Sequence, residues 1–276
     1  AGGIMITSKA NPAIKAIRKL RERKERQATG LFYCEGLRIV GDAFDHKAEF
    51  ECVLAAPELL QSEFGKSLLQ KAVTLNVPIH ELSAAVFTWL SQKDHPQGIA
   101  AVCKQTWTGL GALDLNPGDL VTALDAVADP GNLGTIMRTL DGVGGKGIIL
   151  LDQSTDPFDP GAMRASMGSL FNLQISRTSL AEFVGWKKQT GVKVIGTSGE
   201  ASEDYHGYPY PDPMVLLMGS ERQGLSPEHF RLCDGVVSIP MVGSADSLNL
   251  AVATAVVLYE VYNQRRMDGS VRGGTR

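Results

Sequence analysis

Apolar runs alternate with amphipathic segments through the second half of the chain. The apolar runs, each of strand length, lie at residues 120–127, 148–151, 173–176, 192–196, 214–218 and 236–241. After the first run, Leu133, Ile136, Met137 and Leu140 recur at the spacing of one buried helix face. Strands that are apolar throughout and separated by helices are typical of a parallel sheet covered on both faces. The pattern therefore predicts an α/β fold for this half.

The first half shows the same alternation in shorter segments. Short strand-like runs alternate with helical patterns between residues 31 and 102, which is the pattern of a small β/α domain. The stretch that follows is rich in Gly, Thr, Asn and Pro, as linkers are. We predict an N-terminal domain at residues 5–104, a linker at 105–119, a C-terminal domain at 120–266 and a disordered tail at 267–276.

Composition narrows the classes to which the protein can belong. A hydrophobic content of 43% over 276 residues is enough for a packed core. No apolar run reaches the length of a membrane span, and the N-terminus lacks a signal-peptide pattern. The four cysteines and five histidines are scattered, without the spacing of a zinc site or a disulfide framework. We therefore expect a cytoplasmic protein with reduced thiols, no metal and no membrane partner.

Basic residues are concentrated near the N-terminus of a chain whose net charge is −3. Asn11 and Pro12 form a helix start, a capping residue followed by proline. Eight Lys and Arg residues lie between Lys9 and Arg26, against two glutamates. Such a helix either offers its charges to nucleic-acid phosphates or is a solvated surface helix with internal ion pairs. The residues alone leave both interpretations open.

Glycine and polar residues gather at three joints between a strand and the helix after it. The joints lie at residues 129–138, 219–225 and 242–249. Open α/β sheets bind ligands where the carboxyl ends of their strands meet. A helix that begins there adds unpaired N–H groups and the positive end of its dipole. We therefore expect the three joints to line one site.

The polar residues of these joints also have plainer interpretations. Arg138 suits a phosphate contact or a solvent-facing position on a helix. Glu221 suits a polar ligand or a turn with a capping carboxylate. Asp246 and Ser247 suit a ligand or the cap of a long helix that we expect at residues 247–262.

A glycine run at residues 142–147 has the form G-x-G-x-x-G. A dinucleotide site needs this run after a strand and before a helix. Here the run follows a helix and precedes a strand, so a nicotinamide-dependent oxidoreductase is disfavoured.

Three stretches of the second half match the motifs of a known family. They read DPGNLGTIMRTLDGVG, LLMGSERQGLS and IPMVGSADSLNLAVATAVVLYE. In this order they resemble the SpoU (TrmH) class of SPOUT RNA methyltransferases, over about residues 120–266. In the first half, FYCEGLRIVGDA and HPQGIAAV fit the family's substrate-binding domain, which is similar to a ribosomal-protein fold. Arg222 departs from the family pattern, in which many members have a small residue.

The resemblance implies a trefoil knot in the C-terminal domain, a homodimer formed through that domain, and S-adenosylmethionine as cofactor. It also implies methylation of a ribose 2′-hydroxyl in RNA. The cofactor-binding positions that it implies are Thr197, Gly219, Ile239, Met241 and Leu248. The catalytic positions that it implies are Asn132, Arg138, Glu221, Ser247 and Asn249.

These residue types suit a reaction in which the enzyme orients an activated methyl group and helps to remove a hydroxyl proton. Arginine stays protonated in proteins, so we assign Arg138 to a phosphate contact that orients the ribose and leave the proton acceptor open. We expect Ser247 and Asn249 to bind the ribose or the cofactor. Asn132 is expected to order Arg138 or a partner's loop, and Glu221 to order Asn249 or to transfer a proton.

Large-subunit rRNA is the substrate that the extra N-terminal domain favours. The alternatives are a tRNA 2′-O-methyltransferase of the same class, and a non-catalytic RNA-binding or ribosome assembly protein on the same fold.

Overall fold

The computed structural model describes residues 3–270, which form two compact units. The first unit combines Ala1–Thr106 with Asp156–Phe171, and the second combines Trp107–Thr155 with Asn172–Arg276. The chain therefore passes between the units three times. Of the predicted disordered tail, 267–276, residues 271–276 lie outside the described residues.

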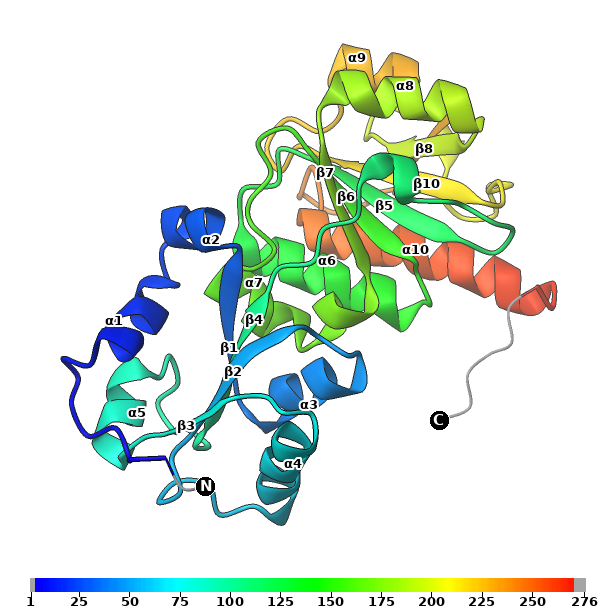
Figure 1. Cartoon of the computed structure of the whole chain (residues 1–276). Coiled ribbons are helices and arrows are strands. Elements are labelled where there is room, and N and C mark those ends of the chain that lie inside the picture. The colour runs from blue at the N-terminus through cyan, green and yellow to red at the C-terminus, as the bar shows by residue number, and fades with distance from the viewer. Residues whose placement is uncertain (1–2, 271–276) are drawn as a thin grey trace. The chain divides into compact units, whose positions relative to one another are not determined.

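A parallel sheet of seven strands forms the second unit, as the alternation predicts (Figure 1). Its strand order is β7-β6-β5-β10-β8-β11-β9. The strands are β5 (Leu120–Asp125), β6 (Gly147–Leu151), β7 (Gln174–Thr178), β8 (Lys193–Thr197), β9 (Glu203–Asp204), β10 (Met214–Gly219) and β11 (Gly235–Ser238). The trefoil knot stays a prediction, because strand order does not define how a chain end is threaded.

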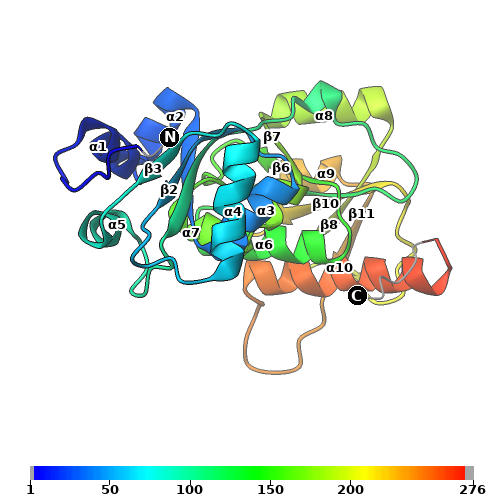
Figure 2. The same cartoon turned by 60° about the horizontal axis from the view of Figure 1, so that its bottom comes forward.

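Helices cover both faces of this sheet (Figure 1). They are α6 (Pro130–Gly142), α8 (Leu180–Thr190), α9 (Pro227–Leu232) and α10 (Leu250–Met267). Helices α6 and α10 run side by side on one face (Figure 2). On the other face, Phe183 and Trp186 of α8 pack against strand residues that include Val121 and Val215. A short 3-10 turn, η1 (Leu110–Ala112), adds to the second unit, while another, η2 (Ser169–Asn172), lies at the end of the segment that returns from the first unit.

Two boundaries near the C-terminus differ from the sequence prediction. The last strand was expected to reach residue 241 but ends at Ser238, shortly before Pro240, which has no N–H to donate to a neighbouring strand. The helix expected at residues 247–262 instead spans Leu250–Met267. Its start was placed too early because several capping residues precede it, and the sequence does not select among them.

The first unit is built on a four-stranded sheet of order β1-β4-β2-β3. Its strands are β1 (Leu31–Glu35), β2 (Phe50–Ala55), β3 (Ile79–Glu81) and β4 (Ile99–Lys104). Strand β4 pairs antiparallel with β1 and β2, while β3 pairs parallel with β2. The helices are α1 (Pro12–Lys19), α2 (Arg23–Thr29), α3 (Leu37–Asp45), α4 (Glu63–Thr74), α5 (Ala84–Leu90) and α7 (Pro160–Ser166).

Part of the basic N-terminal region is used inside the first unit. The one helix expected there is two, α1 and α2, separated by a turn. Arg18 stacks over the Trp89 ring, 4.0 Å from its centroid. The Arg21 guanidinium donates to the carbonyl oxygens of Leu90 and Ser91, at 2.7 and 3.0 Å. These two cations therefore hold the end of α5. Arg26 is buried, and the other basic side chains of the region are exposed.

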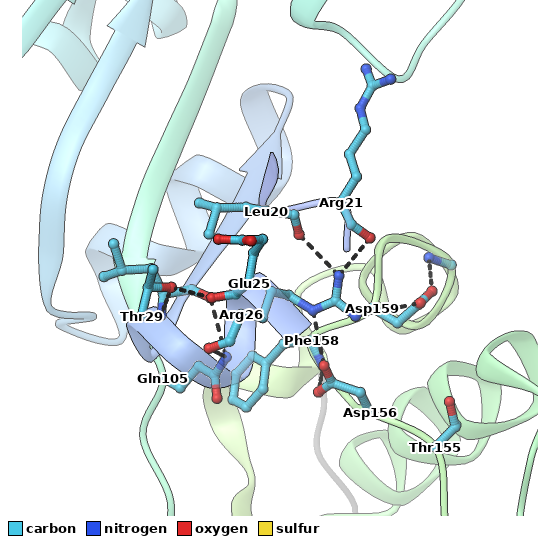
Figure 3. Close-up of polar contacts among 12 residues, drawn as sticks. Leu20, Arg21, Glu25, Arg26, Thr29, Gln105, Thr155, Asp156, Phe158 and Asp159 are labelled. Carbon is cyan, nitrogen blue, oxygen red and sulfur yellow. Dashed lines mark hydrogen bonds and ion pairs between the residues drawn. The ribbon is translucent and has the colours of Figure 1, made fainter. Parts of the chain in front are cut away.

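Residues 156–171 group with the first unit although the predicted second domain, 120–266, contains them. The reason is a buried ion pair (Figure 3). Arg26 is 1% exposed, and its Nε lies 2.9 Å from Asp156 Oδ2. Its Nη1 donates to the carbonyls of Leu20 and Arg21 at 2.9 and 2.8 Å. A charge buried this deeply needs such partners, so the contact fastens α7 to the turn between α1 and α2.

Aromatic packing adds to the attachment of this segment. The Phe158 ring lies 4.7 Å from that of Phe32 on β1, centroid to centroid. Phe171, at the end of the segment, lies 6.0 Å from the same ring. Both ends of the segment are thus anchored on one buried side chain of the first sheet.

Candidate functional site

The site of the second unit lies at the carboxyl ends of its central strands. Strand β10 pairs with β5 and β8 in parallel, and Gly219 stands opposite Asp125. The loops that leave these strands surround a cavity of about 390 Å³, a size within the usual range for small-molecule sites of about 300–1,000 Å³. All five residues predicted to hold the cofactor line it, namely Thr197, Gly219, Ile239, Met241 and Leu248.

Gly219 leaves room for a ligand to approach the backbone. Its φ is +120°, and a Cβ built there would lie 2.2 Å from the carbonyl oxygen of Asp125. Only glycine fits such a contact. Next to it, the Thr197 hydroxyl points back to Met218 Sδ, at 3.3 Å. The cavity therefore combines exposed backbone groups with apolar walls from Ile239 and Met241, which suits a cofactor that has both a flat ring and polar ends.

Three of the predicted catalytic residues form one hydrogen-bonded chain. Asn249 Nδ2 donates to Asn132 Oδ1 at 3.2 Å, and Asn132 Nδ2 donates to Glu221 Oε1 at 2.7 Å. The other carboxylate oxygen, Glu221 Oε2, accepts from the backbone N–H groups of Ala128 and Asp129, at 3.0 and 3.4 Å. These hydrogen bonds connect all three predicted joints, which are far apart in the sequence.

Asn249 is the residue that caps α10. Its Oδ1 accepts from the N–H groups of Ala251 and Val252, at 2.9 and 3.3 Å. The interpretation of Asp246 or Ser247 as the helix cap was therefore wrong. Both are exposed, and both line the cofactor cavity. The loop that carries them extends away from the sheet before it enters α10 (Figure 2).

Arg138 does not join this cluster. It is exposed on α6, and within residues 3–270 it forms no hydrogen bond or ion pair. Asn132 and Arg138 are six positions apart on the helix. At 100° and 1.5 Å per residue, Arg138 lies about 120° around the axis from Asn132 and roughly 9 Å further along. Asn132 and Arg138, both predicted to be catalytic, therefore lie on different faces of α6.

A second hollow adjoins the cofactor cavity. It has a volume of about 660 Å³ and is lined by Ala126, Ala128, Asp129, Pro130 and residues 220–223. Residues 220–223 also line the cofactor cavity, so this loop is a wall that the two spaces share. Glu221 and Arg222, the residue that departs from the family pattern, lie in that wall.

Sequence reasoning missed a buried pair beneath the loop. His229 is buried in α9, and its Nε2 lies 3.5 Å from Asp125 Oδ2. The His229 Nδ1 also contacts the Ser226 hydroxyl. Burial raises the pKa of Asp125, His229 opposes that rise, and Asp152 adds to it. The pair joins the end of β5 to the helix after the shared wall; a lone Asp and a lone His give no spacing signal.

Among residues 3–270, no group of three or more His, Cys, Asp or Glu side chains is arranged to hold a metal ion. Over the same residues, no helix has the length and apolarity that a membrane crossing requires.

Family models match both halves of the chain. The SpoU rRNA Methylase family matches residues 119–259. The MRM3-like substrate binding domain matches residues 11–101.

Curated relatives are similar over nearly the whole chain. The 23S rRNA (guanosine(2553)-2′-O)-methyltransferase RlmP of Bacillus subtilis is 31% identical, over 93% of this chain and 98% of its own. The 23S rRNA (uridine(2479)-2′-O)-methyltransferase of Streptomyces viridochromogenes is also 31% identical, over 89% of this chain and 87% of its own.

A solved structure agrees in fold. The AdoMet-bound rRNA methyltransferase from Sinorhizobium meliloti superposes with a TM-score of 0.87 at 37% identity. The match covers 95% of this chain and 98% of that one. The likeness therefore extends to both units.

Proposed function

Because the chain belongs to the SpoU rRNA methylase family, we propose that it methylates a ribose 2′-hydroxyl of large-subunit rRNA. The protein is an RNA 2′-O-methyltransferase, and S-adenosylmethionine is its cofactor. The rRNA target is supported by the two curated relatives named for 23S rRNA. We also place the protein in the cytoplasm, with which its four free cysteines agree.

The observation that carries the mechanism is the wall shared by the two hollows. When bound, S-adenosylmethionine supplies a methyl group that its sulfonium already activates. The methyl carbon and the ribose 2′-oxygen would have to meet with no protein between them, so we place both along the edge of residues 220–223, the loop that lines both hollows. Positioning of this kind supplies a large share of a rate enhancement. The Glu221 carboxylate fixes the wall, since both its oxygens accept hydrogen bonds.

Ser247 lines the cofactor cavity, and Asn249 lies two residues further on, at the cap of α10. Asn249 uses one amide hydrogen on Asn132 and its oxygen on the cap of α10. Its second amide hydrogen is free to reach a ribose or cofactor oxygen. The Ser247 hydroxyl lines the same cavity. We assign both residues to substrate orientation, and Glu221 with Asn132 to holding Asn249 in place.

We further propose that the protein acts as a homodimer through its second unit. Val252 and Tyr259 are 49% and 46% exposed, and they are seven residues apart on α10. This spacing places them on one face of the helix. An exposed apolar stripe is typical of an interface, and α6, which carries Arg138, runs beside it. A second copy would thus bring Arg138, which does not join the cluster of its own chain, to the site of its partner.

Transfer of tritium from labelled S-adenosylmethionine to RNA tests the reaction. The wild-type protein should label 23S rRNA, and digestion with mass spectrometry should find one 2′-O-methylated nucleotide. Arg138→Ala should lose about 100-fold or more of the rate, as removal of an orienting charge does, while its affinity for S-adenosylhomocysteine stays unchanged. Label in tRNA alone would contradict the rRNA target. Absence of label on any RNA would favour the RNA-binding or assembly protein.

A further inference from the structure

A cavity of about 320 Å³ lies within the first unit, between β1, α3, the loop before β4, and α7. Its walls are largely apolar. The apolar side chains that line it are Cys34, Ile39, Pro160, Met163 and Met167. A hollow of this volume and lining is typical of a site for one small, flat molecule or group. Methionine side chains adapt to the faces of aromatic rings.

Polar groups at the cavity are held in fixed positions. The Glu35 carboxylate, 6% exposed, accepts from the Tyr33 hydroxyl at 2.9 Å and from the Gln92 N–H at 3.1 Å. It also accepts from the Ser91 hydroxyl. Glu35 therefore fastens the loop at residues 91–97 beside β1. The same loop brings the amide groups of Gln92 and Gln97 to the cavity, and an amide can both donate and accept.

Cations surround the mouth of this cavity. Arg38, Lys93 and Arg164 line it and are exposed, and none of them forms an ion pair with any residue from 3 to 270. The Lys93 ammonium reaches the position that a side chain would occupy at Gly36, 2.5 Å from a Cβ built there. Unpaired cations gathered around an apolar slot, in a chain of net charge −3, indicate an anionic ligand.

An adjoining hollow extends the cationic surface. It has a volume of about 430 Å³ and shares Gln92, Lys93, Pro160 and Arg164 with the first. It adds Arg21, which two backbone carbonyls hold in place, and one carboxylate, Asp94. Two hollows in succession along the same cations fit a chain of phosphates better than a single free nucleotide.

We propose that these hollows bind an unpaired nucleotide of the RNA substrate, with its base in the apolar slot and its flanking phosphates on Arg38, Lys93 and Arg164. RNA is read chiefly through unpaired bases that are splayed into pockets. Phosphate contacts from Lys and Arg provide affinity without reading sequence. The proposal rests on RNA being the substrate, and it assigns the first unit a specific contact with that substrate.

The wall made by α7 depends on the buried ion pair of Figure 3. Asp156 and Asp159 precede α7, and Arg26 lies 2.9 Å from the first and 3.6 Å from the second. Arg26 is thus a positioning residue for Pro160, Met163 and Arg164. The slot therefore depends on α7, which follows β5 and β6 of the second unit in the sequence.

Fluorescence anisotropy with labelled 12-nucleotide RNAs tests the proposal in the full chain. The probes are single-stranded U12 and A12 and a fully paired duplex of the same length. The test variant is Lys93→Ala with Arg164→Ala. Its control is Lys47→Ala with Lys104→Ala, which removes two cations of the same unit that are exposed and equally without an ion pair among the described residues.

The test variant should bind single-stranded RNA on the order of ten-fold more weakly at 0.1 M salt, and its salt slope should fall by about 1.4, or 0.7 for each phosphate contact. The control should bind as the wild type does, and duplex binding should change little. Thermal unfolding and affinity for S-adenosylhomocysteine should stay the same in both variants. Equal losses in test and control variants would overturn the pocket, because they would indicate non-specific charge attraction.

Crosslinking locates the base directly. A U12 probe with one 4-thiouridine, irradiated on the wild-type protein, should attach to peptides that contain residues 31–39, 91–97 or 160–167. Attachment only elsewhere would overturn the proposal. A wild-type protein that transfers no methyl group but still crosslinks here would contradict the proposed reaction and leave this pocket standing. The two failures can therefore be told apart.

Discussion

At Gly219 the backbone of β10 runs so close to β5 that a Cβ would lie 2.2 Å from the Asp125 carbonyl oxygen. Asp125 in turn contacts His229 under the wall between the two hollows. A change at this glycine would therefore reach both the cofactor cavity and the buried pair. Gly191, which ends α8 and does not line the cofactor cavity, also has a positive φ of +70°, but a Cβ there would meet no atom within 4 Å.

We expect Gly219→Ala to lower the free energy of unfolding by at least about 2–3 kcal/mol through strain and displacement of β5. Its affinity for S-adenosylhomocysteine, measured by calorimetry, should fall more than ten-fold. Gly191→Ala is the control and should cost only about 1–2 kcal/mol, the usual penalty of a left-handed alanine, with affinity retained. Similar affinities for the two variants would show that Gly219 does not shape the cavity.

Individual site residues were predictable only where a motif carried them. Glu221, Asn132 and Asn249 come from three separate joints, and the resemblance brought them together before their hydrogen bonds were known. The residues alone left Glu221 open to interpretation as a turn with a capping carboxylate, and they favoured Asp246 or Ser247 over Asn249 as the cap. The separation of Arg138 from Asn132 follows from their six-residue spacing on a helix, whereas the hydrogen bonds of Asn132 to the other two residues depend on how α6 begins relative to the strand ends.

At the scale of elements, the start of β11 is fixed to β8 by one carboxylate. Asp234 follows α9, and its Oδ2 accepts from the N–H of Val194 at 2.9 Å and lies 3.1 Å from Lys187 Nζ. Burial favours the protonated acid, but the Val194 hydrogen bond and Lys187 outweigh it, so the pKa of Asp234 is lowered. The folded state therefore stabilises the ionised form of the Asp234 carboxyl group.

Asp234→Asn should reduce stability by about 1 kcal/mol near neutral pH, the typical net value of a partly exposed hydrogen bond to a charge. Because the folded pKa is the lower one, the wild-type advantage is complete above the ordinary carboxyl pKa of about 4 and disappears as pH falls through the folded pKa. Urea unfolding from pH 3 to 7 measures this. Asp114→Asn is the control and should show no such dependence. The Asp114 side chain is exposed, and it forms no hydrogen bond among the described residues. A pH-independent difference at Asp234 would contradict the assignment.

The sequence predicted the presence of helices and strands better than the residues at which they begin and end. The apolar runs became strands of a parallel sheet because a strand buried on both faces leaves a clear apolar pattern. The start of α10 was placed too early, since Ser247 and Asn249 are equally good caps. The choice of Asn249 depends on its bond to Asn132, which is 117 residues away in the sequence.

For the whole molecule, the proposed dimer predicts that two inactive variants can restore each other. Arg138→Ala removes the arginine. Asn249→Ser removes the amide that binds Asn132 but keeps a good cap for α10. Co-refolding equal amounts should recover about a quarter of the wild-type activity if Arg138 serves the site of the other copy, since half of the dimers are mixed and each has one intact site.

Mixtures that stay inactive although native mass spectrometry shows mixed dimers would place Arg138 in the site of its own chain. Mixing two Arg138→Ala preparations is the control and should recover nothing. A monomer at all concentrations would contradict the dimer itself.

The division into units was the least predictable feature. Strands and helices alternate evenly through residues 120–266, so no pattern indicates that 156–171 packs on the first sheet. That assignment depends on two contacts, Arg26 with Asp156 and Phe32 with Phe158. The two members of each contact are more than a hundred residues apart in the sequence. Long-range partners of this kind leave no local periodicity.

The interleaving of the two units limits how such enzymes can be recombined. An RNA-recognition module transplanted from a relative by a single cut near residue 106 would arrive without α7 and without the carboxylates that neutralise Arg26. A working graft must carry two separate pieces of sequence, the second inserted inside the catalytic half. New RNA targets are therefore more accessible by altering side chains around the slot than by exchanging whole modules.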